Sequence, residues 1–293
     1  MTAPVAAPRM ARRSSLRRRW PLTRVVAQIL VVLGAILVLI PFAWMARTAL
    51  MSLADIFAIP VLLLPTEFQW QNFAGAWEKG NIGLYTINSL IVATLATAGT
   101  VVSSSVAAYG FAFLKSKWRD RLFYLVLSGL LIPGVVTLVP SYMIFRQLGW
   151  LNTWLPLTLP YWFGISAFSI FLLRQFFRTI PKELREAAKI DGASEFRIYA
   201  RIIAPLAGPA HAAVAIFAFL FSWNDLFSPL IYINSEERQL LPIGLASFPN
   251  PQGVTEWNLL MAAALMAMVP CLLLFFFFQR YFIQGIVTSG LRG

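Results

Sequence analysis

The stretch REAAKIDGASEFRIYARIIAPLAGPA, residues 185–210, is a charged interruption in a chain whose other long segments are apolar. Just ahead of it, Thr179 and Pro181 form a signal for the start of a helix. Glu183 and Glu186 follow in the first turns, where carboxylates are favoured by the positive end of the helix dipole. The pattern therefore predicts a short helix that begins beside Pro181.

A break at Asp191-Gly192 separates this helix from a second one. Gly192 suits a helix end because glycine adopts the left-handed conformation without a steric penalty. Ser194 can cap the second helix through its hydroxyl, and we expect that helix to run through Ile203 and to be stopped by Pro205. The product is a helix–turn–helix elbow.

One face of the first helix carries Leu184, Ala187 and Ala188, at spacings of three and four residues. Two adjacent alanines allow a partner surface to approach closely, and the charged residues around them can fix its orientation. The pattern is equally compatible with an amphipathic loop that lies on a membrane surface. Physics alone leaves both interpretations open.

Composition defines the broad class of protein. Hydrophobic residues make up 59% of the 293 residues and charged residues only 12%, which is typical of a polytopic membrane protein and excludes a soluble function. With a single cysteine, Cys271, the chain cannot form an intrachain disulfide.

A helix needs about 20 mostly apolar residues to cross the hydrocarbon core of a bilayer. Six stretches of the sequence satisfy this requirement. They are residues 25–44, 84–113, 122–145, 155–173, 210–233 and 259–278. We therefore expect an all-α polytopic membrane protein with six transmembrane helices.

Lysine and arginine concentrate in alternate connections, and this sets the expected orientation. The two tails, the second connection and the fourth connection hold twenty of these residues, and the other three connections hold four. We therefore expect both termini and the elbow to face the cytoplasm. The net charge of +12 is then explained by membrane topology, without a nucleic-acid partner.

The sequence lacks the motifs of two rival classes. It has no GxxxxGKS or GxxxxGKT loop for a nucleotide, no HExxH zinc pair and no GxSxG elbow, and His211 is its only histidine. We expect no catalytic residue and no metal site, although a membrane-embedded enzyme is kept as an alternative. An ion-coupled secondary carrier is the other alternative, but only Asp225 looks intramembrane, whereas such carriers place several ionisable groups within their spans.

Four polar or aromatic residues within the spans are ambiguous. Asn224 and Asp225, preceded by Trp223, could line a translocation cavity or could tie a proline-bent helix to its neighbour. Asn88 raises the same question in the second span, where the hydroxyl run 103–105 favours close helix packing. The sequence is compatible with both interpretations.

The elbow also carries a family signature. Glu186, Ala187 and Ala188, then Gly192 after three residues, Ile202 after nine more, and finally Pro205 resemble the EAA motif of permease subunits in binding-protein-dependent ABC importers. The family usually has leucine before the proline, and Ala204 departs from that pattern. The resemblance implies that the following residues contact an ATPase: Glu186, Ala187, Ala188, Asp191, Gly192, Ala193, Ile202 and Pro205.

The resemblance extends over residues 84–293, in segments such as FSWNDLFSPLIYI and QRYFIQGIVTSGLRG, which are similar to the smaller permease of maltose-type importers. It implies a type I importer fold in a bacterial or archaeal cytoplasmic membrane. The implied partners are a second homologous permease, two ABC ATPases that bind ATP and Mg²⁺, and an extracytoplasmic binding protein. The implied solute is a sugar, an oligosaccharide or a polyol.

The expected domain organisation follows from these segments. A cytoplasmic basic tail, residues 1–24, precedes a permease domain of residues 25–279, and a cytoplasmic tail of residues 280–293 follows it. The coupling loop occupies residues 175–209. The resemblance further implies that the long outer connections, residues 47–83 and 234–258, contact the binding protein.

Overall fold

The structure is a computed structural model that describes residues 22–248 and 255–290. Residues 1–21 of the predicted basic tail, residues 249–254 of the third outer connection and the last three residues lie outside the described part. Contacts divide the chain into two units, Met1–Met45 and Ala46–Gly293. Most of α1 belongs to the first unit, and α2 to α15 belong to the second.

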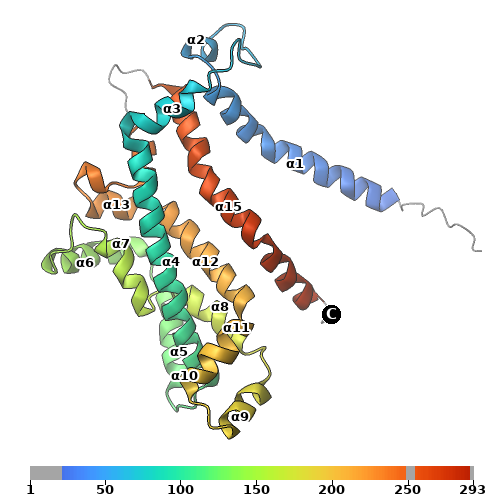
Figure 1. Cartoon of the computed structure of the whole chain (residues 1–293), viewed down its shortest axis with the longest axis vertical. Helices are drawn as coiled ribbons and strands as arrows, with labels where there is room; N and C mark the ends of the chain where they lie inside the picture. The colour runs from blue at the N-terminus through green and yellow to red at the C-terminus, as the bar shows by residue number, and fades with distance from the viewer. Residues whose placement is uncertain (1–21, 249–254, 291–293) are drawn as a thin grey trace, which may run out of the picture. The chain divides into compact units, whose positions relative to one another are not determined.

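Helices account for all the regular secondary structure of the described residues, as the composition predicts (Figure 1). The longer helices are α1 (Leu22–Ala49), α4 (Ile82–Phe113), α5 (Arg119–Ser128), α6 (Gly134–Gln147), α8 (Ala167–Phe177), α9 (Lys182–Ile190), α12 (Gly208–Trp223) and α15 (Trp257–Gly290). The short ones are α2 (Leu53–Ile56), α3 (Gln71–Glu78), α7 (Leu155–Thr158), α10 (Glu195–Ile198), α11 (Ala204–Leu206), α13 (Phe227–Tyr232) and α14 (Leu241–Ala246). Single turns η1 (Lys79–Asn81), η2 (Gly129–Leu131), η3 (Leu159–Phe163), η4 (Tyr199–Ile203) and η5 (Glu236–Arg238) connect them.

Four helical segments of the described chain are long and apolar enough to cross a membrane, and the number rises to six if each of two bent pairs crosses once. The upper number equals the number of predicted spans, and six crossings stay a prediction. The bent pairs are α5 with α6, at an angle of 100°, and the α10–α11 segment with α12, at 79°.

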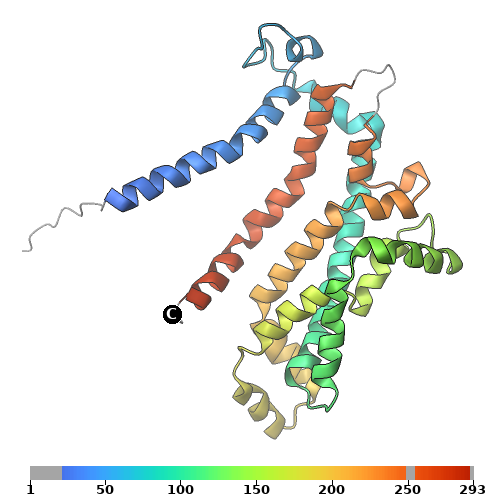
Figure 2. The same cartoon turned by 180° about the vertical axis from the view of Figure 1, so that it is seen from behind.

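The third predicted span is not one straight helix, which corrects the expectation for residues 122–145 (Figure 2). Pro133 lies at the bend, and the residue before a proline is driven out of the helical region by the proline ring. Ile132 accordingly has an extended backbone, with ψ of 114°. The segment therefore turns sharply between η2 and α6.

The ends of three other spans differ from the prediction. The fourth span is interrupted at Gly164, whose φ of +72° ends η3. The fifth ends at Trp223, and α13, which contains Pro229 in its first turn, follows as a separate piece. The last helix continues past the predicted end at residue 278 to Gly290.

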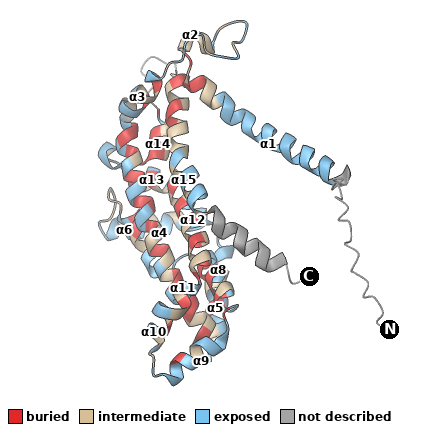
Figure 3. Ribbon diagram, turned by 45° about the vertical axis from the view of Figure 1, so that its right-hand side comes forward, coloured by how far each residue is buried: buried red, intermediate tan, exposed pale blue. Residues whose placement is uncertain are grey.

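Helix α4 is the central helix of the second unit, and it packs against α8, η3, α12 and α14 (Figures 1 and 3). Small residues allow this close approach. At Gly99 an added Cβ would lie 2.6 Å from the ring of Trp162, so only glycine fits there. Ala96 and Ala108 are also buried on this helix. Because α4 contacts so many elements, its position determines where the rest of the unit lies.

The two basic connections meet at one end of α4. Arg174, at the end of α8, donates a hydrogen bond of 3.2 Å to the carbonyl of Phe111 and forms a 3.5 Å ion pair with Asp120 at the start of α5. At the other end of α4, the side chain of Asn88 donates to the backbone carbonyls of Glu237 and Gln239, at 2.9 Å each. The positively charged connections thus lie at one end of the helix and the third outer connection at the other.

This arrangement predicts which residues an impermeant thiol reagent reaches in intact cells. In a chain whose Cys271 is replaced by alanine, Glu237→Cys should be labelled from outside and Arg197→Cys should be labelled only after the cells are opened. Both positions are exposed, so accessibility depends on the side of the membrane alone. Labelling of Arg197→Cys in intact cells would contradict the orientation.

Candidate functional site

The elbow forms as the sequence predicts, with α9 beginning directly after Pro181 and ending at Ile190. Its end is a Schellman motif, in which the amide of Gly192 donates to Lys189 at 3.0 Å and the amide of Ala193 donates to Ala188 at 2.9 Å. Gly192 has φ of +76°, and no atom lies within 4 Å of an added Cβ. Glycine is therefore required there by backbone conformation and not by lack of space.

The second half of the elbow differs from the prediction. Ser194 caps α10 as expected, and its hydroxyl accepts a hydrogen bond of 3.3 Å from the amide of Arg197. Pro205, however, does not stop the helix. A π-helical turn, η4, precedes it, and the helical segment continues through Pro205 to Leu206. The chain bends only after Leu206, at the start of α12.

The exposed face of α9 keeps two of the three residues that spacing predicts, and Ala188 is the exception. Ala188 is buried in the core of the unit, whereas Ala187, Glu186 and Leu184 are exposed. Ala188 is drawn inward because the Schellman turn folds α10 back against it. Asp191 is exposed, like Gly192 and Pro205.

Two large apolar side chains stand out at the tip of the elbow. Ile190 is 87% exposed and Phe196 is 75% exposed, although both flank a highly charged loop. Ala193 and Ile202, two other predicted contact residues, instead pack partly against the core. The surface available to a partner is therefore the outer side of α9 together with Ile190 and Phe196.

A single carboxylate holds the elbow together. Glu195 accepts hydrogen bonds from Arg185 at 2.5 and 3.2 Å, forms an ion pair with Lys189 at 2.6 Å, and accepts a hydrogen bond from the Tyr109 hydroxyl at 2.6 Å. Arg185 and Lys189 belong to α9, Glu195 begins α10, and Tyr109 belongs to α4. We call Tyr109, Arg185, Lys189 and Glu195 the elbow cluster.

The electrostatics of the elbow cluster favour a charged Glu195. Burial alone would raise the pKa of this carboxyl, but hydrogen bonds from Lys189, Tyr109 and Arg185 outweigh burial and lower the pKa to about 2, from an ordinary value of 4.5. A lowered pKa means that the stabilisation is fully present above about pH 4.5 and is lost only as the pH falls toward 2. Glu195 is therefore ionised at neutral pH, and small pH changes around neutrality leave the contacts of the elbow cluster unchanged.

A second polar chain joins the π-helical turn to two spans. The hydroxyl of Tyr199 donates to Ser105 at 2.9 Å, and Ser105 lies 2.7 Å from the Nε2 atom of His211 on α12. The only histidine thus has a hydrogen-bond partner at the start of its span, as expected for a structural residue.

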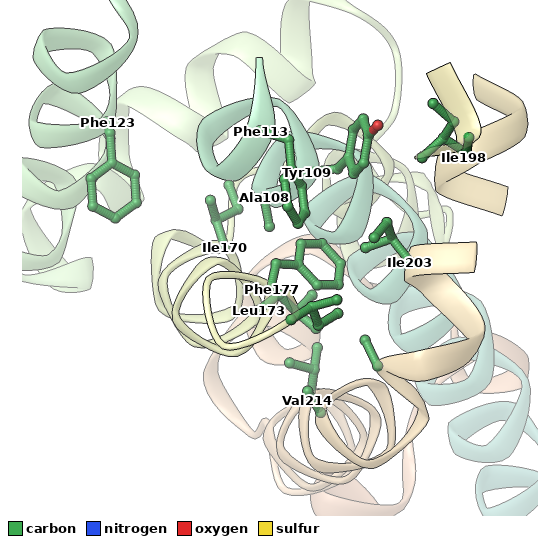
Figure 4. Close-up of a cluster of buried hydrophobic side chains, with 14 residues drawn as sticks. Ala108, Tyr109, Phe113, Phe123, Ile170, Leu173, Phe177, Ile198, Ile203 and Val214 are labelled. Carbon is green, nitrogen blue, oxygen red and sulfur yellow. The ribbon is translucent and has the colours of Figure 1, made fainter. Parts of the chain in front are cut away.

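Apolar side chains pack beside the elbow cluster and beside the hydrogen-bonded residues Tyr199, Ser105 and His211. Ile198 and Ile203 are fully buried against Tyr109 and Phe113 of α4 and against Phe177 of α8 (Figure 4). Burying one such side chain contributes about 1.5–3 kcal/mol relative to leaving it exposed. The base of the elbow is thus part of the core of the unit, while its tip is free of that core.

The predicted polar residues of the spans make local contacts. Trp223 is buried, and its indole donates a hydrogen bond of 3.1 Å to the carbonyl of Ala267. Asn224 donates back to the carbonyl of Leu220 at 2.7 Å. Together with the bonds from Asn88 to the third outer connection, these contacts tie helices and loops together.

Asp225 acts as a cap at the break between α12 and α13. Its carboxylate accepts a hydrogen bond of 3.1 Å from the amide of Ser228, three residues on. It borders a hollow of about 20 Å³, which is room for about one water molecule. These contacts favour the structural interpretation of Asp225.

A larger cavity lies elsewhere, between α4, α8 and α12. Its volume is about 490 Å³, and none of Asn88, Trp223, Asn224 or Asp225 lines it. Hydroxyls and aromatic rings line it instead: Thr100, Tyr161, Ser166, Ser169, Phe168, Phe217 and Phe221. Sequence patterns gave no signal for these residues, because serine and threonine in a span are usually explained by packing.

The fold and the elbow define a multi-span transport subunit. A model of the family described as binding-protein-dependent transport system inner membrane component matches residues 99–288. The chain belongs to this family.

Relatives support the assignment along nearly the whole chain. The chain is 34% identical to the probable ABC transporter permease protein YurM of Bacillus subtilis, over 94% of its length and 91% of the relative. It is 33% identical to the diacetylchitobiose uptake system permease protein NgcG of Streptomyces coelicolor, covering 90% and 87%. It is 31% identical to the sn-glycerol-3-phosphate transport system permease protein UgpE of Yersinia enterocolitica, covering 89% and 95%.

A solved structure shows the same fold. It belongs to a bacterial ABC transporter involved in the import of the acidic polysaccharide alginate, and it matches with a TM-score of 0.79 at 20% identity, over 89% of this chain and 96% of that one.

The elbow cluster makes a prediction about local stability. Glu195→Gln should weaken the contacts to Arg185 and Lys189 and cost about 1 kcal/mol, since the carboxylate is partly exposed. Backbone amides of α9 and α10 should then exchange hydrogen severalfold faster. Glu186→Gln, an exposed change on the same helix, should leave exchange unchanged. Equal exchange in the two variants would contradict the role of Glu195.

The cap predicts a different outcome for two changes at Asp225. Asn can still accept the hydrogen bond from the Ser228 amide, so Asp225→Asn should keep the thermal stability of the wild type. Asp225→Ala removes the acceptor and should cost about 1 kcal/mol. The measurement is the melting temperature in detergent. Equal losses for Asn and Ala would indicate that the charge itself matters and would contradict the role of the acceptor.

Proposed function

We propose that this chain is the membrane permease of an ATP-driven importer that takes up a sugar, oligosaccharide or polyol-type solute. Its partners would be a second, homologous permease, two ABC ATPases and a substrate-binding protein outside the membrane. ATP and Mg²⁺ would bind to the ATPases and not to this chain. The cytoplasmic membrane of a bacterium or archaeon is the proposed location, with the elbow on the inner side.

The coupling role is supported by one observation: the tip of the elbow exposes apolar side chains, whereas its base is held on α4. Ile190 and Phe196 expose apolar area at the tip, where a partner can bury it, and buried apolar area is the main source of affinity in protein association. Glu195 and the buried Ile198 hold the base on α4. A force applied at the tip would therefore move α4 and would not simply bend the loop.

The cavity between α4, α8 and α12 supports a polyhydroxylated solute. Aromatic rings such as Phe168 and Phe217 offer apolar faces, and the hydroxyl of Tyr161 offers a donor and an acceptor. This combination suits a sugar ring, which has apolar faces and hydroxyl edges. The relatives named for diacetylchitobiose and for sn-glycerol-3-phosphate handle solutes of this chemistry.

The outer connections are candidates for contact with the binding protein. Asn72 donates to the carbonyls of Ala49 and Met51 at 2.8 and 2.9 Å, and it accepts a hydrogen bond of 3.1 Å from Asn258. Lys79 forms an ion pair with Glu256. These bonds join the first outer connection to the start of α15 and would give a docking protein a firm surface.

Charge reversal and backbone strain in the elbow test the coupling role. Glu186→Lys reverses a charge on the exposed face of α9, and Gly192→Val strains a position with φ of +76°. Both variants should insert normally, yet the reconstituted complex should lose most of the ATP hydrolysis that the loaded binding protein stimulates. The measurement is ATPase activity with and without binding protein, alongside subunit stoichiometry.

Lys115→Glu, an exposed charge reversal in the other basic connection, is the matched control and should keep its stimulation. Wild-type stimulation in both elbow variants, at full subunit occupancy, would overturn the coupling role. Proton- or sodium-dependent uptake without any copurifying ATPase would instead favour a secondary carrier.

A further inference from the structure

A second, strongly polar cavity lies at the end of α4 that carries the basic connections. Its volume is about 360 Å³, and it lies between the end of α4, the start of α5 and the end of α8. Four cations and one carboxylate line it, an excess of three positive charges: Arg119, Arg174, Arg178, Lys182 and Asp120. The elbow cluster does not use any of these residues.

Two of the four cations are already engaged. Arg119 donates two hydrogen bonds to Asp120, at 3.0 and 3.1 Å. Arg174 is 8% exposed, and it contacts the Phe111 carbonyl, Asp120 and the ring of Phe123, whose centroid lies 3.9 Å from its guanidinium carbon. Asp120 is thus shared between two arginines, and its negative charge is already paired with them.

The other two cations have no such partner. Within residues 22–248 and 255–290, the side chains of Arg178 and Lys182 form no hydrogen bond or ion pair that meets ordinary distance criteria. Both are exposed at the rim of the cavity. A fixed buried guanidinium below and two free cations at the rim form a site for an anion, with several donors directed at one space.

The surface next to the cavity is apolar and uncovered within the second unit. Tyr124 lines the cavity and is 68% exposed, and Leu125 beside it is also 68% exposed. Leu122, one turn away, is 49% exposed. These side chains lie on α5, which enters the predicted third span, so they face the place where lipid acyl chains would be.

We infer that this cavity binds the phosphate group of an anionic phospholipid, with Arg178 and Lys182 contacting the phosphate and Arg174 supplying a fixed positive charge beneath it. The apolar side of α5 takes the acyl chains. Basic pockets between membrane helices on the cytoplasmic side suit such headgroups, because that leaflet is rich in anionic lipid. The inference rests on the charge and placement of the cavity and does not depend on the transported solute.

A lipid bound in this cavity would also hold the elbow in place. Lys182 is the first residue of α9, so a lipid bound to it would hold the start of the elbow at the membrane surface. The elbow cluster holds the other end of α9 through Lys189. The lipid would thus complete a two-point attachment of this helix.

The test uses the full-length chain purified in detergent, with phosphatidylglycerol titrated in and bound lipid counted by native mass spectrometry. Arg178→Gln together with Lys182→Gln should weaken the strongest phosphatidylglycerol site by about tenfold or more. Both residues are exposed, so the fold should persist. Arg197→Gln together with Arg201→Gln removes the same charge from exposed positions outside the cavity and should leave that site within about twofold of the wild type.

Two further arms identify the ligand. Phosphatidylcholine should not fill the site, because its headgroup carries no net charge. Excess inorganic phosphate should fail to displace phosphatidylglycerol if the acyl chains contribute, whereas displacement that depends on Arg178 and Lys182 would assign the same phosphate site to a soluble anion. Equal weakening in the cavity and control variants, or equal binding of phosphatidylcholine, would overturn the inference.

Discussion

The three-way contact of Glu195 is the interaction on which the rest of the site depends. One carboxylate contacts Arg185 and Lys189 of α9 and the hydroxyl of Tyr109 on α4, and it begins α10 itself. Without it, two short helices of nine and four residues would be joined to the core by little more than apolar contacts. Helices of this length are not stable alone in water. The carboxylate therefore converts a loop into a rigid extension of the central helix.

Breaks in the predicted spans also shape the packing around α4. Pro133 and Gly164 lie at breaks between helical segments, a third break separates α12 from α13, and small residues such as Gly99 let helices pack closely against α4. Freed backbone groups at such breaks need new partners inside a membrane. Asp225 supplies one of them, because its carboxylate accepts from the amide of Ser228 at the start of α13. The breaks thus concentrate contacts on a single helix, which is the helix that the elbow holds.

Local patterns predicted the elements of the elbow, and long-range contacts determined what they do. Gly192 and Ser194 could be placed from the sequence, because a left-handed helix end and a helix cap depend on only a few neighbouring residues. Pro205 was misjudged, since the π-helical turn that accommodates it has no clear sequence signal. The partnership of Glu195 with Tyr109 joins residues 86 positions apart, and no periodicity reveals it. Ala188 is buried because α10 folds back against α9, and residue spacing along α9 alone could not show this.

The central claim is that the tip of the elbow and the end of α4 move as one body. It is tested most directly by the distance between spin labels at Ile190 and Leu114, two exposed positions at the elbow tip and just after α4, in a chain whose Cys271 is replaced. Pulsed electron resonance on the assembled transporter should give one narrow distance that is the same with and without bound ATP. A distance that broadens, or that shifts by about the 5 Å rise of a helical turn when ATP binds, would contradict the account.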